Sequence, residues 1–159
     1  MADDCERLSG PGEEHALLEP FVGTFRAEVR MWMGPGDPMV STGTMKNTMI
    51  FGDTFLEQVY DGDESSTGPF PDFKGRGYWG FNRHMNRWEG VWIDTASTMI
   101  QTDTGTRDGD TWTMLGEVPS MQKKSVIRLV DPDHHVMEMY FVDPEGNEFK
   151  GMEIAYARA

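Results

Sequence analysis

The chain has 159 residues, enough for one domain with a sizeable core, and it carries 27 acidic against 14 basic residues, a formal net charge of −13. This balance argues against nucleic acid as a partner, because phosphates are bound by clustered Lys and Arg, and also against an anionic membrane surface. The apolar runs are far shorter than the ~20 residues that cross a bilayer, so no membrane insertion is expected.

The first ten residues, MADDCERLSG, are polar and acidic. They lack the basic and apolar regions of a secretory signal. We therefore expect a disordered tail over residues 1–10 and a single folded domain over residues 11–159. The one cysteine, Cys5, lies in this tail. Because it excludes an intramolecular disulfide, it favours a cytoplasmic location.

The next segment, GPGEEHALLEPF, predicts one short helix, with Glu13 and Glu14 in its first turn and Pro20 at its end. Beyond it, β-type residues occur in short runs separated by turn signals. These runs predict ten strands, over residues 23–33, 39–51, 54–62, 74–82, 87–95, 97–107, 110–118, 123–130, 134–142 and 147–158.

Short links between successive strands imply antiparallel neighbours. An open sheet of this kind would leave two unpaired edges, and closure into an up-and-down barrel removes them. We therefore predict an all-β fold, an antiparallel β-barrel of about ten strands, with the N-terminal helix plugging or flanking one end. The lumen of such a barrel is either filled by side chains or holds one small ligand.

Several segments carry a family resemblance: LLEPFVGTF, MVSTGTMKNTMIFG, GYWGFN, VWIDTASTMI, VDPDHHVMEMYF and FKGMEIAYAR. Together they resemble the uncharacterised bacterial family called domain of unknown function 1579, from about residue 12 to residue 158. The resemblance implies a small single domain without an established activity.

A more distant resemblance is to the calycin superfamily of lipocalins, fatty-acid-binding proteins and nitrobindin-like barrels. Calycins often begin with Gly-x-Trp on the first strand, and a basic residue near the last strand packs on that Trp. Here Gly23-Thr24-Phe25 and Arg158 stand at these places. The resemblance thus implies that Phe25 and Arg158 close one end of the barrel through a cation–π contact.

The stretch DHHVMEMYF (133–141) raises the question of a metal site. Alternation on a strand puts His135, Met137, Met139 and Phe141 on one face and His134 on the other, so the two histidines cannot chelate one ion. Thioethers suit Cu(I), but no cysteine accompanies them, and methionine also fills irregular apolar interiors. We therefore expect no metal, and an apolar face lining the lumen with His135 at its rim.

The turns on either side of this strand predict its partners. DPEG suits a three-residue loop that pairs Phe141 with Phe149, and the turn at 131–133 puts Arg128 opposite Glu138. In the same register Glu153 lies on the inward face. Either a β-bulge turns it outward or it is a carboxylate in the lumen.

The hairpin of GYWGFN and RWEGVWIDT predicts two tryptophan–glycine pairs, Trp79 with Gly90 and Trp92 with Gly77. These indoles either simply pack on the sheet, or Trp92 and Asp94 face the lumen with Met99 near by. An apolar cavity with a few placed polar groups is what a ligand site needs.

Three functions remain open. The leading one is binding of a small hydrophobic ligand in the lumen, with Asp94 or Glu153 as the polar anchor. The second is an enzyme in which Asp94 or Glu153, with His135, acts as general base. The third is a solid barrel that binds a partner or forms a homodimer. No cofactor is expected. The candidate ligand-binding residues are Trp92, Asp94, Met99, His135, Met137, Met139, Phe141 and Glu153.

Overall fold

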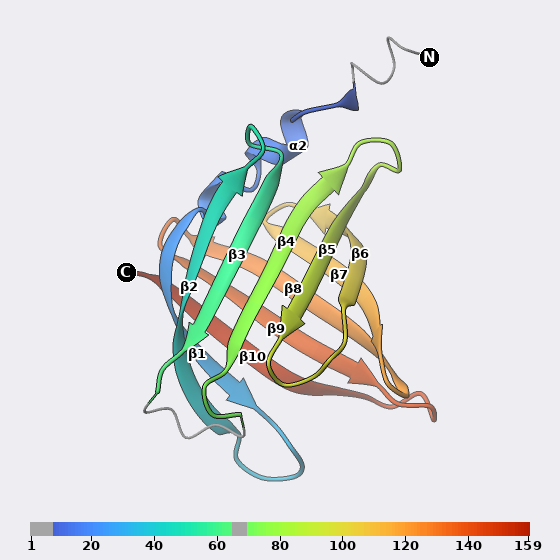
Figure 1. The fold of residues 1–159 in the computed structure, drawn as a ribbon. Coiled ribbons are helices and arrows are strands. Elements are labelled where there is room, and N and C mark those ends of the chain that lie inside the picture. Colours follow the sequence, from blue (N-terminus) through green and yellow to red (C-terminus); the bar gives the residue numbers. More distant parts are fainter. Residues whose placement is uncertain (1–7, 65–69) are drawn as a thin grey trace.

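The computed structural model of the protein describes residues 8–64 and 70–159. The tail expected over residues 1–10, with Cys5, lies mostly outside these residues. Within them, two short helical turns precede ten strands (Figure 1). The elements are α2 (Glu13–Ala16), η1 (Glu19–Phe21), β1 (Gly23–Met31), β2 (Met39–Ile50), β3 (Phe55–Gly62), β4 (Lys74–Asn82), β5 (Arg87–Asp94), β6 (Gln101–Asp108), β7 (Thr111–Val118), β8 (Met121–Asp131), β9 (His134–Val142) and β10 (Glu148–Arg158).

Each strand pairs antiparallel with the next, and β1 also pairs with β10, which closes the barrel. The closing ladder runs from the pair Phe25–Arg158 to the pair Met31–Met152. The predicted all-β, up-and-down barrel is therefore confirmed, and closure leaves neither terminal strand with an open edge. Strand β6 begins at Gln101 rather than at residue 97 as predicted, because residues 95–100 connect it to β5.

The N-terminal segment plugs one end of the barrel, which we call the closed end (Figure 1). Helix α2 ends at Ala16, before Pro20, which instead lies in the 3₁₀ turn η1 where its missing N–H is not needed. Phe21 in η1 is buried against the barrel's interior. Asn47 of β2 holds this turn in place, because its Nδ2 donates a hydrogen bond to the Phe21 carbonyl at 2.9 Å.

The core consists of two clusters of buried side chains. The first fills the closed end and contains Leu18, Phe21, Leu56, Trp79, Trp88, Trp112 and Met114. The second lies on β1, β2, β3 and β10 and contains Phe25, Ala27, Val29, Met45, Tyr60, Ile154 and Tyr156. Alternation along the strands supplies these inward side chains, except for Leu18 and Phe21, which come from the N-terminal plug.

The predicted partners of β9 are right as far as Lys150 on the β10 side and are shifted on the β8 side. Phe141 pairs with Phe149 as predicted. On the β8 side, Val126 rather than Arg128 lies opposite Glu138, and Arg128 pairs with Val136. A ladder irregularity between Leu129 and Asp131 accompanies this difference. Because the shift is two residues, every side chain keeps its predicted face.

A β-bulge decides the position of Glu153. The β9–β10 ladder slips between Lys150 and Met152, so that Glu153 pairs with Glu138. Its carboxylate binds Lys150, whose Nζ also lies 3.1 Å from Glu138 Oε2 on the outer surface. Of the two alternatives for Glu153, the bulge is the one observed, and a carboxylate in the lumen at this position is wrong.

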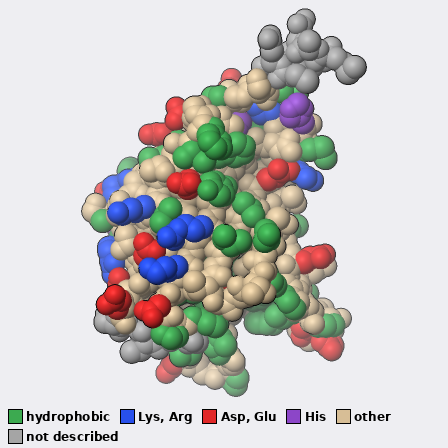
Figure 2. Space-filling model, viewed as in Figure 1, with side chains coloured by type: hydrophobic (Ala, Val, Ile, Leu, Met, Phe, Trp, Pro, Cys, Tyr) green, Lys and Arg blue, Asp and Glu red, His purple; other side chains and the backbone are tan. Residues whose placement is uncertain are grey.

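The outer face of the barrel carries interleaved charges. On β3 and β4, Asp61 lies 3.8 Å from Lys74 and 3.4 Å from Arg76, and Figure 2 shows acidic and basic side chains mixed on this face. On β9, the Tyr140 hydroxyl donates to Glu138 at 2.6 Å. These exposed pairs each contribute at most about 1 kcal/mol, so stability must come mainly from the interior.

Candidate functional site

A cavity of about 340 Å³ occupies the barrel interior. It runs from Phe21 and His135 at the closed end to Met31, Met39 and Phe73 at the opposite end, which we call the open end. Most of its lining is apolar. Its aromatic and aliphatic lining side chains are Phe21, Val29, Met31, Met39, Met45, Tyr60, Phe70, Phe73, Tyr78, Trp79, Val91, Trp92, Ala96, Met114, Val118, Ile127, Met137, Met139, Phe141, Met152, Ile154 and Tyr156.

One side of the cavity is a methionine wall, formed by Met137, Met139 and Phe141 of β9. Alternation on β9 points these side chains inward, as the sequence predicts. Opposite them on β8, Ile127 pairs with Met137. Methionine is unbranched and polarisable, so this wall can adapt to the shape of an apolar molecule.

Trp92 and Asp94 both line the cavity near the open end. Trp92 lies flat on β4, since a Cβ on Gly75 or Gly77 would fall 2.0 or 2.6 Å from its indole ring. The predicted pairing of Trp92 with Gly77 is present. Trp92 Nε1 donates to Asp94 Oδ2 at 2.9 Å, and the amide of Ala96 donates to Asp94 Oδ1 at 2.9 Å. The Asp94 carboxylate is thus held by the chain's own donors.

His135 lines the cavity at the closed end rather than at the rim, where the sequence placed it. Its ring stacks on Tyr156 with the centroids 4.4 Å apart, and the rings of Phe21 and Phe25 approach it edge-on at 5.0 and 4.7 Å. Burial lowers its pKa to about 4, and the positive charge of Arg158 acts in the same direction. His135 is therefore a neutral ring in the floor of the cavity at pH 7.

Two of the candidate residues lie outside the cavity. Met99 is half-buried in the connection between β5 and β6, where its amide donates to Ser97 Oγ at 3.2 Å, and it does not contribute to the lining. Glu153 faces outward because of the bulge in β10. The other six candidates, Trp92, Asp94, His135, Met137, Met139 and Phe141, all line the cavity.

The sequence reasoning missed several polar side chains that line the cavity. Four of them lie together on two strands, Gln101 and Asp103 of β6, and Lys123 and Ser125 of β8. We call these four residues the polar recess. Lys123 is only 3% exposed, and its Nζ lies 3.2 Å from Gln101 Oε1 and 3.2 Å from Asp103 Oδ1. Alternation along KKSVIRLV could have predicted that Lys123 points into the lumen, because it puts Lys123 on the same face of the strand as Ile127.

A glycine makes this ion pair possible. Asp103, Gly116 and Lys123 form one row across β6, β7 and β8. A Cβ on Gly116 would fall 2.0 Å from Asp103 Oδ1. Because β7 carries no side chain at this point, the carboxylate occupies the space above Gly116 and comes within reach of the ammonium group.

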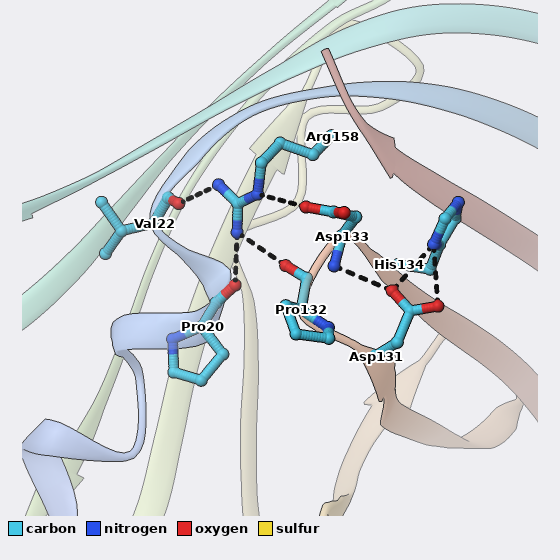
Figure 3. Close-up of polar contacts among 7 residues, drawn as sticks. All are labelled: Pro20, Val22, Asp131, Pro132, Asp133, His134 and Arg158. Atoms are coloured by element: carbon cyan, nitrogen blue, oxygen red, sulfur yellow. Dashed lines mark hydrogen bonds and ion pairs between the residues drawn. The ribbon is translucent and has the colours of Figure 1, made fainter.

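Arg158 fastens the closed end from outside (Figure 3). Its guanidinium donates to the carbonyls of Val22, Pro20 and Pro132 at 2.8, 3.2 and 3.0 Å, and its Nε lies 3.4 Å from Asp133 Oδ1. It also lies over Phe25, with its Cζ 4.6 Å from the ring centroid. We call these contacts of Arg158 the clamp. The clamp joins the N-terminal plug, the β8–β9 turn and the last strand.

The surface histidine of the pair, His134, is the first residue of β9 and contacts the turn that precedes it. His134 Nδ1 lies 2.8 Å from Asp131 Oδ1, on the outside of the barrel (Figure 3). The two histidines thus face apart, as alternation on the strand predicts. The His134 side chain is held against the turn by Asp131, and of the two histidines only His135 lines the cavity.

The family model described as protein of unknown function DUF1579 matches residues 10–158. The chain belongs to this family. No curated protein matches the DUF1579 chain.

Two solved structures share the fold of this DUF1579 barrel. Rv2717c from M. tuberculosis is 15% identical, with a TM-score of 0.68, over 94% of this chain and 99% of that one. The S-type phycobiliprotein lyase CPES from Guillardia theta is 13% identical, with a TM-score of 0.60, over 94% of this chain and 98% of that one. At these identities the likeness concerns the fold alone, that is, the shape of the barrel.

In the described part of the DUF1579 chain, helices are too short or too polar to cross a bilayer.

Proposed function

We propose that the DUF1579 barrel binds one small, largely apolar molecule in its lumen. The observation that carries this proposal is the cavity of about 340 Å³ behind a mostly apolar lining. Pockets for small ligands typically have volumes of about 300–1,000 Å³, apolar walls and a few placed polar groups. The methionine wall and Trp92 would supply contact area. Asp94 and the polar recess are the groups available to orient the molecule.

The enzyme alternative has less support. A general base needs a carboxylate that is free to accept a proton, and near His135 if the two act together. The oxygens of Asp94 accept hydrogen bonds from Trp92 and Ala96, whereas the ring of His135 contacts aromatic residues at the closed end. Glu153 lies outside the lumen. The solid-barrel alternative would need a filled interior, and the interior holds a cavity.

The first experiment asks whether the lumen takes up an apolar molecule. The intact protein would be titrated with the neutral fluorescent probe N-phenyl-1-naphthylamine, and protein from cells would be examined by native mass spectrometry for a bound molecule. We expect saturable binding of one probe per chain. If binding of the probe does not saturate at any concentration, and the mass spectrum shows no bound molecule, the proposal is contradicted.

A pair of variants locates the binding site. Met139→Trp adds bulk to the methionine wall and should weaken probe binding at least about 10-fold, because it fills the cavity. Met85→Trp is the control, because Met85 is exposed in the β4–β5 turn. It should leave the affinity unchanged. Equal affinities of the two variants would place the probe outside the lumen.

A further inference from the structure

The polar recess is a built feature of the lumen whose polar groups are only partly satisfied within the chain. An ammonium group has three donors, and Lys123 directs one to Gln101 at 3.2 Å. Its 3.2 Å approach to Asp103 Oδ1 is an ion pair outside hydrogen-bond geometry, and that buried oxygen has no hydrogen-bond partner among the described residues. The Ser125 hydroxyl, on a residue 4% exposed, likewise has none in the described chain.

Unpaired polar groups of this kind are costly in an apolar interior. A buried donor or acceptor left without a partner is destabilising, and most buried polar groups in proteins are paired. The recess lies beside the methionine wall, since Lys123 pairs with Phe141 and Ser125 pairs with Met139 across β8 and β9. A molecule held against that wall would therefore bring its polar end to the free donors and acceptors of the recess.

The charges of the lining indicate which polar end fits. Lys123 is the one Lys or Arg among the described residues lining the cavity, and Asp103 already balances its charge. The remaining acidic lining residues are Asp63 and Asp94. Hydrogen bonds from Arg26 and Thr42 lower the pKa of Asp63 to about 2, so it is ionised at pH 7. A carboxylate ligand would thus enter a lining with no spare positive charge, whereas an uncharged oxygen group would meet no repulsion.

We propose that the polar recess binds an uncharged oxygen group of the ligand, a hydroxyl or a carbonyl, while the methionine wall holds the ligand's apolar body. This inference rests on the proposed function, and it narrows the ligand class to neutral amphiphiles such as long-chain alcohols, aldehydes or esters. Lys123 would donate to the oxygen, and Asp103 or Ser125 could accept from a hydroxyl.

The test compares decanol with decanoate as competitors of N-phenyl-1-naphthylamine at pH 8, where decanoate is ionised. Wild-type protein should bind decanol at least about 10-fold more tightly than decanoate. The double variant Lys123→Met/Asp103→Leu removes both charges and leaves neither one orphaned in the interior. It should bind decanol about 5- to 10-fold more weakly than wild type, the effect of one lost hydrogen bond, whereas its affinity for the apolar fluorescent probe should not fall.

The control double variant is Lys124→Met/Glu148→Leu. Lys124 Nζ and Glu148 Oε1 lie 3.1 Å apart on the outer face of the barrel. This variant therefore removes an ion pair of the same kind that does not line the cavity. It should leave both decanol and probe affinities unchanged. If the two double variants bind decanol equally well while both still bind the probe, the recess proposal is overturned and the lumenal site stands. If wild-type protein binds none of the three compounds, the proposed function itself fails.

A single variant supplies a gain of binding that misfolding cannot imitate. Asp103→Asn keeps an acceptor beside Lys123 but removes the balancing charge. Decanoate should then gain about 10-fold relative to decanol, because the ammonium group becomes free to pair with it. An unchanged ratio of decanol to decanoate affinity in this variant would contradict the recess as the site of the polar group.

Discussion

The two ends of this barrel are built from the same alternating strands but are filled in opposite ways. At the closed end, Phe21, Trp79 and Trp112 meet edge to face, with centroids 5.0 to 5.4 Å apart. Toward the open end, methionines, a flat indole and a few polar groups surround a cavity of about 340 Å³. The comparison indicates that the packed closed end stabilises the fold, whereas the open end leaves room for the cavity.

Glycines beneath large side chains help to create that space. Trp92 lies over Gly75 and Gly77, the Tyr60 hydroxyl over Gly43, and Phe141 over Gly151. In each case a Cβ on the glycine would fall less than 3 Å from the side chain above it. The large side chains therefore lie against the barrel wall instead of projecting into the lumen, because the sheet leaves room for them there.

The largest effect should come from the closed end. Trp112→Ala removes a side chain that is 1% exposed and contacts three other aromatic rings of the floor. We expect a loss of about 3–5 kcal/mol in the free energy of unfolding, measured by urea denaturation. Leu115→Ala, on the exposed side of the same strand, should change it by less than about 0.5 kcal/mol. Similar losses for the two variants would contradict the interpretation that packing at the closed end stabilises the fold.

The second effect concerns the pH dependence contributed by His135. Its folded-state pKa of about 4 lies below the ordinary value of 6.5, so the unfolded chain binds a proton first as the pH falls. Stability is fully present above pH 6.5 and is lost progressively down to about pH 4. From pH 7.5 to pH 4.5, titration of His135 alone should lower the free energy of unfolding by about 2–3 kcal/mol.

The variant His135→Phe should remove this part of the acid-side slope, because Phe fits among the same aromatic rings and does not titrate. His134→Gln is the control on the outer face and should keep the slope. Urea denaturation at the two pH values gives the measurement. A wild-type slope in His135→Phe would mean that other groups cause the acid sensitivity.

The third effect tests the clamp at the closed end. Arg158→Met removes three hydrogen bonds to backbone carbonyls and the contact over Phe25. Because the side chain is about one third exposed, we expect a loss of about 2 kcal/mol. Arg30→Met is the control, since Arg30 pairs with Glu28 on the surface and should cost less than about 0.5 kcal/mol. Equal losses would show that the clamp adds nothing beyond a surface charge.

The smallest effect should come from the methionine wall. Met139→Ala enlarges an existing cavity instead of opening a new one in packed surroundings, so the free energy of unfolding should fall by about 1 kcal/mol or less. Probe binding should persist. A loss as large as that of Trp112→Ala would erase the difference between the two ends.

The sequence predicted the fold in detail where local rules decide the outcome. Turn signals and alternation gave the ten strands, the inward face of β9 and the pairing of Trp92 with Gly77. The pairing of Phe25 with Arg158 followed from a family resemblance and is present at the barrel seam. Six of the eight candidate residues line the cavity for the same reason, since a strand's faces follow from a period of two.

The errors arose where a single residue alters the ladder or where partners are distant in sequence. The slip between Lys150 and Met152 turns Glu153 outward. The β8–β9 register lies two residues from the predicted one, with an irregularity between Leu129 and Asp131 beside the turn. His135 was placed at the rim because nothing local shows which end of the strand the N-terminal plug covers. The polar recess was missed because its pair, Asp103 and Lys123, meets only across a third strand.

The sequence by itself thus determined an acidic, all-β chain whose strands alternate between an apolar inner face and a charged outer face. Only the tertiary structure decided that the interior is filled at one end and hollow at the other, and that Lys123 faces Asp103 inside it. The physical reason is that alternation is a local property of each strand, whereas cavity volume and ion pairing depend on which side chains closure of the barrel brings face to face.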